Sequence, residues 1–164
     1  MKMFVKTLLV ITMFIYLLVL TKLVLLKHYA ISEVFNFHFD MFQIKMSNFI
    51  PFKTIITYMF LTKDLSLNIR IENLVGNIIG FTPLGLLLPL ISKKMFRLKV
   101  ITLTTFLLSF TYEVIQLFTY LGTFDIDDLI LNTLGGVLGY LLIKLIYVTL
   151  FVRKKSNKYN EATY

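Results

Sequence analysis

Residues 7–26 read TLLVITMFIYLLVLTKLVLL, and this stretch decides the fold class. Twenty residues of α-helix rise about 30 Å, which matches the hydrocarbon core of a bilayer. The one charged residue, Lys22, lies one turn from the end, where its side chain can extend to the interface. The run is too long for a signal peptide, and no small-residue cleavage site follows around Ala30. We therefore predict an uncleaved membrane anchor.

Three further apolar runs follow, at residues 69–91, 100–121 and 129–151. The chain of 164 residues is 57% hydrophobic and only 16% charged, whereas soluble domains carry roughly 25% charged residues. A soluble chain of this length could not bury so much apolar surface in one core. The sequence predicts an all-α integral membrane protein, in which residues 1–152 form a four-helix transmembrane bundle.

A shorter apolar segment lies between the first two spans. Pro51 is followed by FKTIITYMFL at residues 52–61, which is too short to cross a bilayer. We expect an amphipathic helix in the first external loop that lies in the membrane interface or re-enters it. Upstream, residues 35–41 alternate between apolar and polar side chains, a pattern typical of a short strand.

The basic residues outnumber the acidic ones, and the net charge is +8. Beside apolar spans, cations indicate membrane topology rather than nucleic-acid binding, so we expect no nucleic-acid partner. Four cations lie in residues 92–99 and four in residues 153–158, whereas residues 120–127 contain none. The positive-inside rule then places both termini in the cytoplasm and the acidic loop outside. The polar tail, residues 153–164, is expected to be disordered.

Composition also excludes some chemistry. The chain has no cysteine, which excludes disulfides and thiolate catalysis. Arginine, the usual residue of bidentate phosphate recognition, is rare beside lysine, so composition alone indicates no phosphate site. No serine-hydrolase elbow, zinc-protease motif or phosphate loop is present.

Polar residues recur along one face of each of the last three spans, at helical intervals of three and four. Polar groups in hydrocarbon cost free energy, so these faces should turn toward one another and away from lipid. The polar residues of these faces are Asn73 and Asn77 in the second span, Ser109, Glu113 and Gln116 in the third, and Asp128 and Asn132 in the fourth. With the predicted topology, Asn77, Glu113 and Asn132 also converge in depth, roughly 6–10 Å below the outer surface.

Glu113 is the hardest of these residues to explain by structure alone. A carboxylate in the middle of a span costs roughly 2.5–3.5 kcal/mol. No cation lies near it in the sequence, so it should be protonated, paired with a cation from elsewhere, or open to water. We expect Glu113 to face Asn77 and Asn132 in a shared pocket that opens to the outer side.

Two sets of candidate site residues follow from these faces and from the acidic loop. The candidate catalytic residues are Glu113, Asp127 and Asp128, acting as acid, base or ligands of a divalent cation. Structural roles remain open beside these, with Asp125 or Asp127 as helix caps and the amides as hydrogen-bond links between helices. The candidate substrate-binding residues are Asn73, Asn77, Ser109, Gln116, Asp125 and Asn132.

Two pairs of glycines lie four residues apart in the second and fourth spans. They are Gly76 with Gly80, and Gly135 with Gly139. Small residues at this spacing let two helices approach backbone to backbone. We therefore predict close helix packing at both pairs.

Four short stretches read NFIPFKTI at residues 48–55, NIIGFTPLG at 77–85, SFTYEVIQ at 109–116 and DIDDLILNTLGGVLG at 125–139. Together they resemble the VanZ-like family. The resemblance covers nearly the whole chain except the tail. It implies a plasma-membrane protein of a Gram-positive bacterium, from a family linked to low-level teicoplanin resistance, with no settled reaction. Many relatives carry an arginine just before the acidic motif, and this chain has none there.

Three functions are compatible with this sequence. The first is a non-catalytic modulator of the cell envelope and of the response to glycopeptide antibiotics, teicoplanin in particular. The second is a membrane enzyme that acts on a lipid-linked or phosphorylated envelope substrate through Glu113, Asp127 and Asp128. The third is a small transporter or flippase subunit, which four spans could form only as an oligomer. The implied partners are the bilayer, a lipid-linked cell-wall precursor or a glycopeptide antibiotic, and a second copy of the chain.

Overall fold

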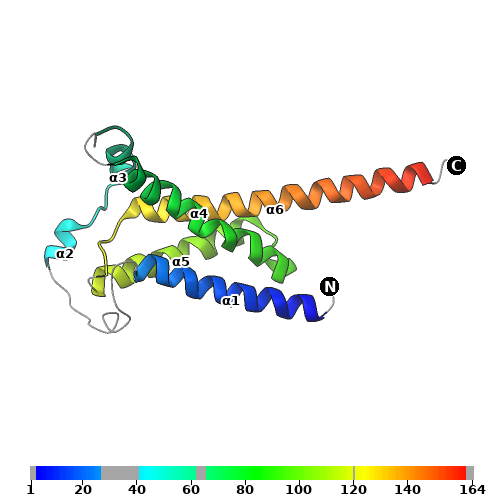
Figure 1. The fold of residues 1–164 in the computed structure, drawn as a ribbon, viewed down its shortest axis with the longest axis horizontal. Helices are drawn as coiled ribbons and strands as arrows, with labels where there is room; N and C mark the ends of the chain where they lie inside the picture. Colours follow the sequence, from blue (N-terminus) through cyan, green and yellow to red (C-terminus); the bar gives the residue numbers. More distant parts are fainter. Residues whose placement is uncertain (1–2, 27–40, 62–65, 120, 162–164) are drawn as a thin grey trace.

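The computed structural model describes residues 3–26, 41–61, 66–119 and 121–161. Within these residues, four helices are long and apolar enough to cross a membrane. The predicted all-α membrane bundle is therefore confirmed. The four helices are α1 (Met3–Leu25), α4 (Leu67–Ile91), α5 (Leu98–Thr119) and α6 (Ile126–Glu161), and they lie side by side along the long axis of the molecule (Figure 1).

The most extensive helix contact in the bundle is between α4 and α6. Their backbones touch at glycines. A Cβ atom at Gly135 would lie 2.2 Å from the carbonyl oxygen of Ile78, and one at Gly139 would lie 2.0 Å from that of Thr82. Any larger residue would push the two helices apart. The predicted close packing is therefore confirmed for this pair of glycines.

The second glycine pair behaves differently. A Cβ atom at Gly76 would meet no atom within 4 Å, and one at Gly80 would meet only Leu20 Cδ1, at 3.7 Å. The prediction of close packing is therefore wrong at Gly76, because this part of α4 borders open space rather than another helix. That space belongs to the cavity described in the next section.

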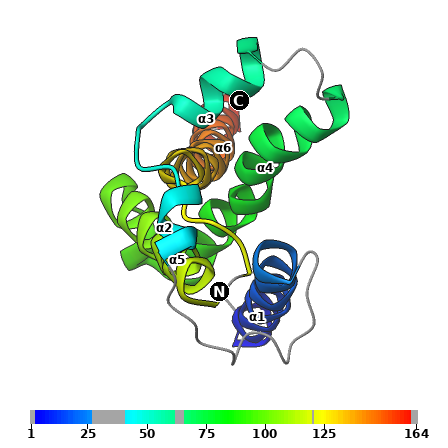
Figure 2. The ribbon, with the colours of Figure 1, turned by 90° about the vertical axis from the view of Figure 1, so that its left-hand side faces the viewer.

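Helix α1 packs against α4 and α5, and Figure 2 shows it beside them at the edge of the bundle. Hydrogen bonds join α1 to both neighbours, and one of them runs from Nε2 of Gln116 on α5 to the carbonyl oxygen of Val24 on α1 (3.1 Å). The hydroxyl of Tyr16 donates to the carbonyl of Gly80 (2.8 Å), and the hydroxyls of Thr21 and Tyr112 lie 2.8 Å apart. Such bonds satisfy polar groups that lipid cannot solvate. The apolar core around Phe81 forms between these helices.

The two ends of the bundle differ in their connections. At one end, which we call the basic end, a turn with the 3₁₀ helix η3 (Lys93–Met95) joins α4 to α5. The opposite end, which we call the acidic end, carries the loop 121–125 and three short helices. The free ends of α1 and α6 both lie at the basic end (Figure 1). The short helices are α2 (Met41–Met46), α3 (Lys53–Ile56) and the π-helix η2 (Thr57–Leu61).

Outside the four spans, the sequence also predicted a short helix after Pro51, a disordered tail and a strand-like segment at residues 35–41. The segment after Pro51 is helical and too short to span, as expected. Helix α6 continues to Glu161 and so includes residues 153–161 of the predicted tail, whose expected disorder stays a prediction. No glycine or proline lies between residues 140 and 161 to end the helix. The alternating residues 35–40 lie outside the described residues.

Candidate functional site

The start of α6 is capped by Asp125. The backbone N–H of Asp127 donates to Oδ1 of Asp125 (2.8 Å), which is the geometry of a helix N-cap. The backbone N–H of Asp125 itself donates to Oε2 of Glu113 on α5 (2.8 Å). The capping role that the sequence left open for Asp125 is thus the one observed, and it connects the acidic loop to Glu113.

Asp127 anchors the segment that contains α3. Its carboxylate accepts from the backbone N–H groups of Phe52, Thr54 (2.7 Å) and Ile55 (3.1 Å). Phe52 has φ 67°, a left-handed conformation that costs a non-glycine residue free energy. Both oxygens of Asp127 are occupied, and the side chain is fully buried. This geometry is that of an anchor rather than of an exposed acid or base.

Asn48 attaches the same segment to the acidic loop at a second point. Its Nδ2 donates to Oδ1 of Asp125 (2.9 Å), and its backbone exchanges bonds with Phe124 and Ile126 in an isolated parallel bridge. The hydroxyl of Thr54 donates to Oδ2 of Asp125 (2.6 Å). We had assigned no role to Asn48 or Thr54, although both lie in the stretch 48–55 that carries the family resemblance.

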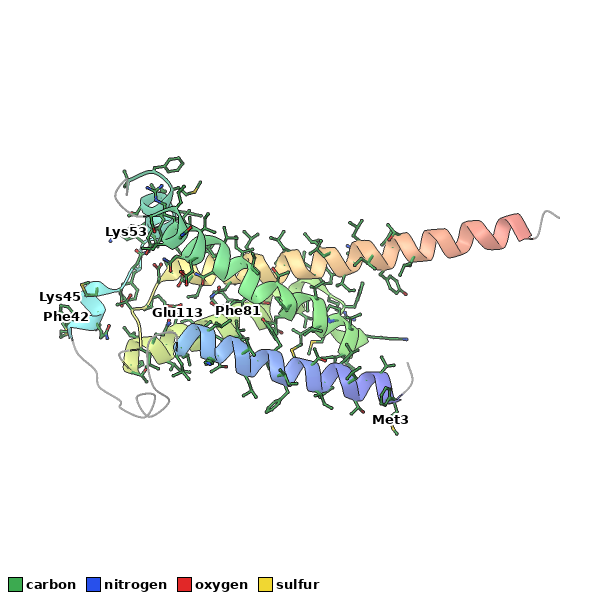
Figure 3. The ribbon with its side chains drawn as sticks, in the orientation of Figure 1. Met3, Phe42, Lys45, Lys53, Phe81 and Glu113 are labelled. Atoms are coloured by element: carbon green, nitrogen blue, oxygen red, sulfur yellow. The ribbon has the colours of Figure 1, made fainter. Side chains whose placement is uncertain are left out.

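Glu113 lies inside the bundle toward the acidic end (Figure 3). Its side chain is 2% exposed, so it faces the protein interior rather than lipid. Asp128 lies close enough to interact with it electrostatically. We expected Glu113 to share a pocket with Asn77 and Asn132, but it does not line the cavity that Asn77 lines. The carboxylate of Glu113 instead accepts from the backbone N–H of Asp125 in the acidic loop, and a pocket shared with Asn77 and Asn132 stays a prediction.

The amides of Asn77, which is half-buried, and of Asn132, which is buried, bond to partners other than Glu113. Nδ2 of Asn77 donates to Oδ1 of Asp128 (2.6 Å), which joins α4 to α6. Nδ2 of Asn132 donates to the hydroxyl of Ser109 (2.9 Å), which joins α6 to α5. Both amides therefore link helices, as one of the structural readings proposed. The Oδ1 atom of Asn132 is buried and has no partner among the described residues.

A cavity of about 300 Å³ opens beside the Asn77–Asp128 pair, between α1, α4, α5 and α6. Its polar wall includes three of the predicted substrate-binding residues, Asn73, Asn77 and Gln116, together with Asp128 and Glu72. The sequence analysis did not include Glu72, because it precedes Asn73 by one position and so does not lie on the polar face of Asn73 and Asn77. The apolar wall is formed by Leu20, Leu23, Val24 and Phe81.

The predicted residues therefore divide into three groups. Asn73, Asn77, Gln116 and Asp128 lie at the cavity. Ser109, Glu113 and Asn132 are buried and do not line it. Asp125 and Asp127 bond to the segment that contains α3. The groups of the cavity wall suit a ligand with hydrogen-bonding or cationic groups at one end and an apolar part at the other.

The carboxyl groups of Glu113, Asp125, Asp127 and Asp128 lie toward the acidic end of the bundle. The hydrogen bonds described above reach them from neutral donors, which are backbone N–H groups, amides and a hydroxyl. Within the described residues, no three acidic or histidine side chains converge closely enough to hold a metal ion. His28 and His38 lie outside the described residues.

The fold and the site define a small, multi-pass α-helical membrane protein with a cluster of acidic residues and an amphipathic cavity at one end. No solved structure matches the chain. Residues 13–147 match the VanZ/LLP1 family. Protein VanZ of Enterococcus faecium is 34% identical over 126 residues, which cover 76% of this chain and 66% of that relative. The chain thus spans about two thirds of the relative's length, and it belongs to the VanZ/LLP1 family.

Proposed function

We propose that this protein modulates the cell envelope of a Gram-positive bacterium and its response to glycopeptide antibiotics, teicoplanin in particular. In this proposal the protein acts in the plasma membrane with both termini in the cytoplasm. The acidic end then faces outward, where cell-wall precursors and antibiotics meet. Membership of the VanZ/LLP1 family supports this setting.

The observation that carries the proposal is the cavity beside Asp128. It combines a carboxylate and amides on one wall with apolar side chains on the other, and it lies at the acidic end of the bundle. A lipid-linked cell-wall precursor or a glycopeptide antibiotic offers both kinds of surface to such a site. The protein would change the response to the antibiotic by holding one of these ligands near the outer surface.

Gly76 offers a direct test, because it borders the cavity and a Cβ atom there meets nothing within 4 Å. In a susceptible Gram-positive host, the wild-type protein should raise the inhibitory concentration of teicoplanin more than that of vancomycin. Gly76→Leu should abolish this effect by filling the cavity, whereas Gly76→Ala should preserve it.

Membrane abundance of each variant, measured by immunoblot, is the control for folding. Unchanged tolerance to both antibiotics in cells that contain the wild-type protein would argue against the proposed function. An effect that survives in Gly76→Leu would argue against the cavity as its origin.

A further inference from the structure

A second polar cavity, of about 370 Å³, lies at the acidic end between α2, α3 and the loop 121–125. It shares no residue with the cavity beside Asp128. Lys45 of α2 and Lys53 of α3 line it, together with the hydroxyl groups of Tyr58 and Thr123. Figure 3 shows the two lysines at the same end of the molecule, on different short helices.

The charge of this cavity is positive. Lys45 and Lys53 are both exposed, and the one carboxylate in the lining is that of Asp125. Both oxygens of Asp125 already accept hydrogen bonds from within the protein, from Asn48 and Thr54. Among the described residues, neither Lys45 nor Lys53 is paired with a carboxylate. Their ammonium groups and the hydroxyls of the lining can donate to an oxyanion.

Apolar side chains on the segments that carry the two lysines are exposed. Phe42 and Met46 of α2 are 62% and 59% exposed, and Ile50 is 62% exposed. Phe60 and Leu61 of η2 are 68% and 69% exposed. A segment with exposed apolar residues beside lysines is typical of a protein surface that lies in the membrane interface. Lysines at that depth attract anionic lipids.

We propose that this cavity binds a phosphate group, carried by the headgroup of an anionic lipid, through Lys45 and Lys53. Lysine binds phosphate as a point charge, so the scarcity of arginine in the chain does not exclude such a site. The hydroxyls of Tyr58 and Thr123 would donate to the remaining phosphate oxygens. The hydrogen bonds that Asp125 and Asp127 accept from residues 48–55 would hold Lys45 and Lys53 in position around the ligand. This inference does not depend on the function proposed above.

The test uses the full chain reconstituted in neutral phosphatidylcholine nanodiscs with a minor fraction of phosphatidylglycerol. Native mass spectrometry counts the phosphatidylglycerol molecules that stay bound. The double variant Lys45→Gln/Lys53→Gln should weaken this binding about tenfold, since each surface lysine contributes substantially to anionic-lipid attraction. Tyr58→Phe, which removes a single donor, should have a smaller effect in the same direction.

The matched control is Lys93→Gln/Lys94→Gln, which removes the same charge at the basic end. Equal weakening by both double variants would overturn the proposal, because it would reveal general electrostatic attraction. Unchanged binding in Lys45→Gln/Lys53→Gln would also overturn it.

Inorganic phosphate, added as a competitor, distinguishes the two sources of the ligand. Displacement of the lipid at millimolar phosphate would support a site for phosphate itself. Persistence of the lipid, together with its loss in Lys45→Gln/Lys53→Gln, would support a site for the intact headgroup.

Discussion

Asp127 shows how one side chain can organise a loop that is distant in sequence. A buried carboxylate needs partners, and three backbone N–H groups at the start of α3 supply them. Those groups point at one place because Phe52 adopts a left-handed conformation. The carboxylate and the strained turn therefore depend on each other, and loss of either should release the segment.

We expect Asp127→Asn to loosen the segment that contains α3 while the four long helices stay intact. An amide presents an NH₂ group to backbone donors, and hydrogen bonds to charged groups contribute about 1.5–3 kcal/mol each. Limited digestion of the detergent-solubilised protein with trypsin should become faster after Lys53. Asp128→Asn is the control, since no backbone N–H at α3 bonds to Asp128. Equal cleavage rates in the two variants would contradict the anchoring role.

At the scale of the helices, the contact between α4 and α6 should tolerate no side chain at its glycines. Gly139→Ala should destabilise the bundle by about 1–3 kcal/mol, the usual range for overpacking, because its Cβ would overlap the carbonyl of Thr82. Gly76→Ala should be neutral or slightly stabilising, since alanine favours helix and meets no neighbour there. Thermal unfolding in detergent compares the two. A similar midpoint for both variants would show that the helices can separate at little cost.

The positions of the long helices could be predicted from the sequence, because an apolar run of about 20 residues indicates a membrane span. The predicted span 69–91 begins two residues after α4 does and ends at the same residue. The predicted span 100–121 begins and ends two residues after α5 does. The direction of the polar faces was also predictable from helical spacing. Glycine spacing alone, however, could not separate Gly139, which touches another backbone, from Gly76, which borders a cavity.

The partners of the acidic residues could be predicted only in part. The helical spacing of polar residues predicted that Asn77 and Asp128 lie in the same region, because each lies on the polar face of its helix. It could not show that Asp127 bonds to Thr54 or that Glu113 bonds to the backbone of Asp125. Those contacts depend on the path of irregular segments, and such segments have no repeating pattern in the sequence.

For the whole molecule, the arrangement of the helices agrees with the predicted crossing number. The free ends of α1 and α6 lie together at the basic end, as an even number of crossings requires (Figure 1). Helix α6 has 36 residues, which rise about 54 Å and so exceed the hydrocarbon core of about 30 Å. Its last turns therefore extend beyond the basic end of the bundle.

The absence of cysteine makes the proposed orientation easy to measure. A maleimide that cannot cross membranes should label Thr123→Cys in intact cells, because Thr123 is exposed at the acidic end. It should label Met95→Cys at the basic end only after the cells are permeabilised. The physical reason is the cluster of cations around Met95, which membrane insertion retains in the cytoplasm. The reverse labelling pattern would place both termini outside.

The anchoring of α3 by Asp127 also constrains when the protein can finish folding. The carboxylate lies 72 to 75 residues after the backbone groups that it binds. At about 5–20 residues per second, a ribosome needs about 4–15 seconds to synthesise that interval. Until then the first loop has emerged without its attachment point. A nascent chain that stalls before α6 would keep this loop undocked, and membrane proteases could distinguish it from the completed protein.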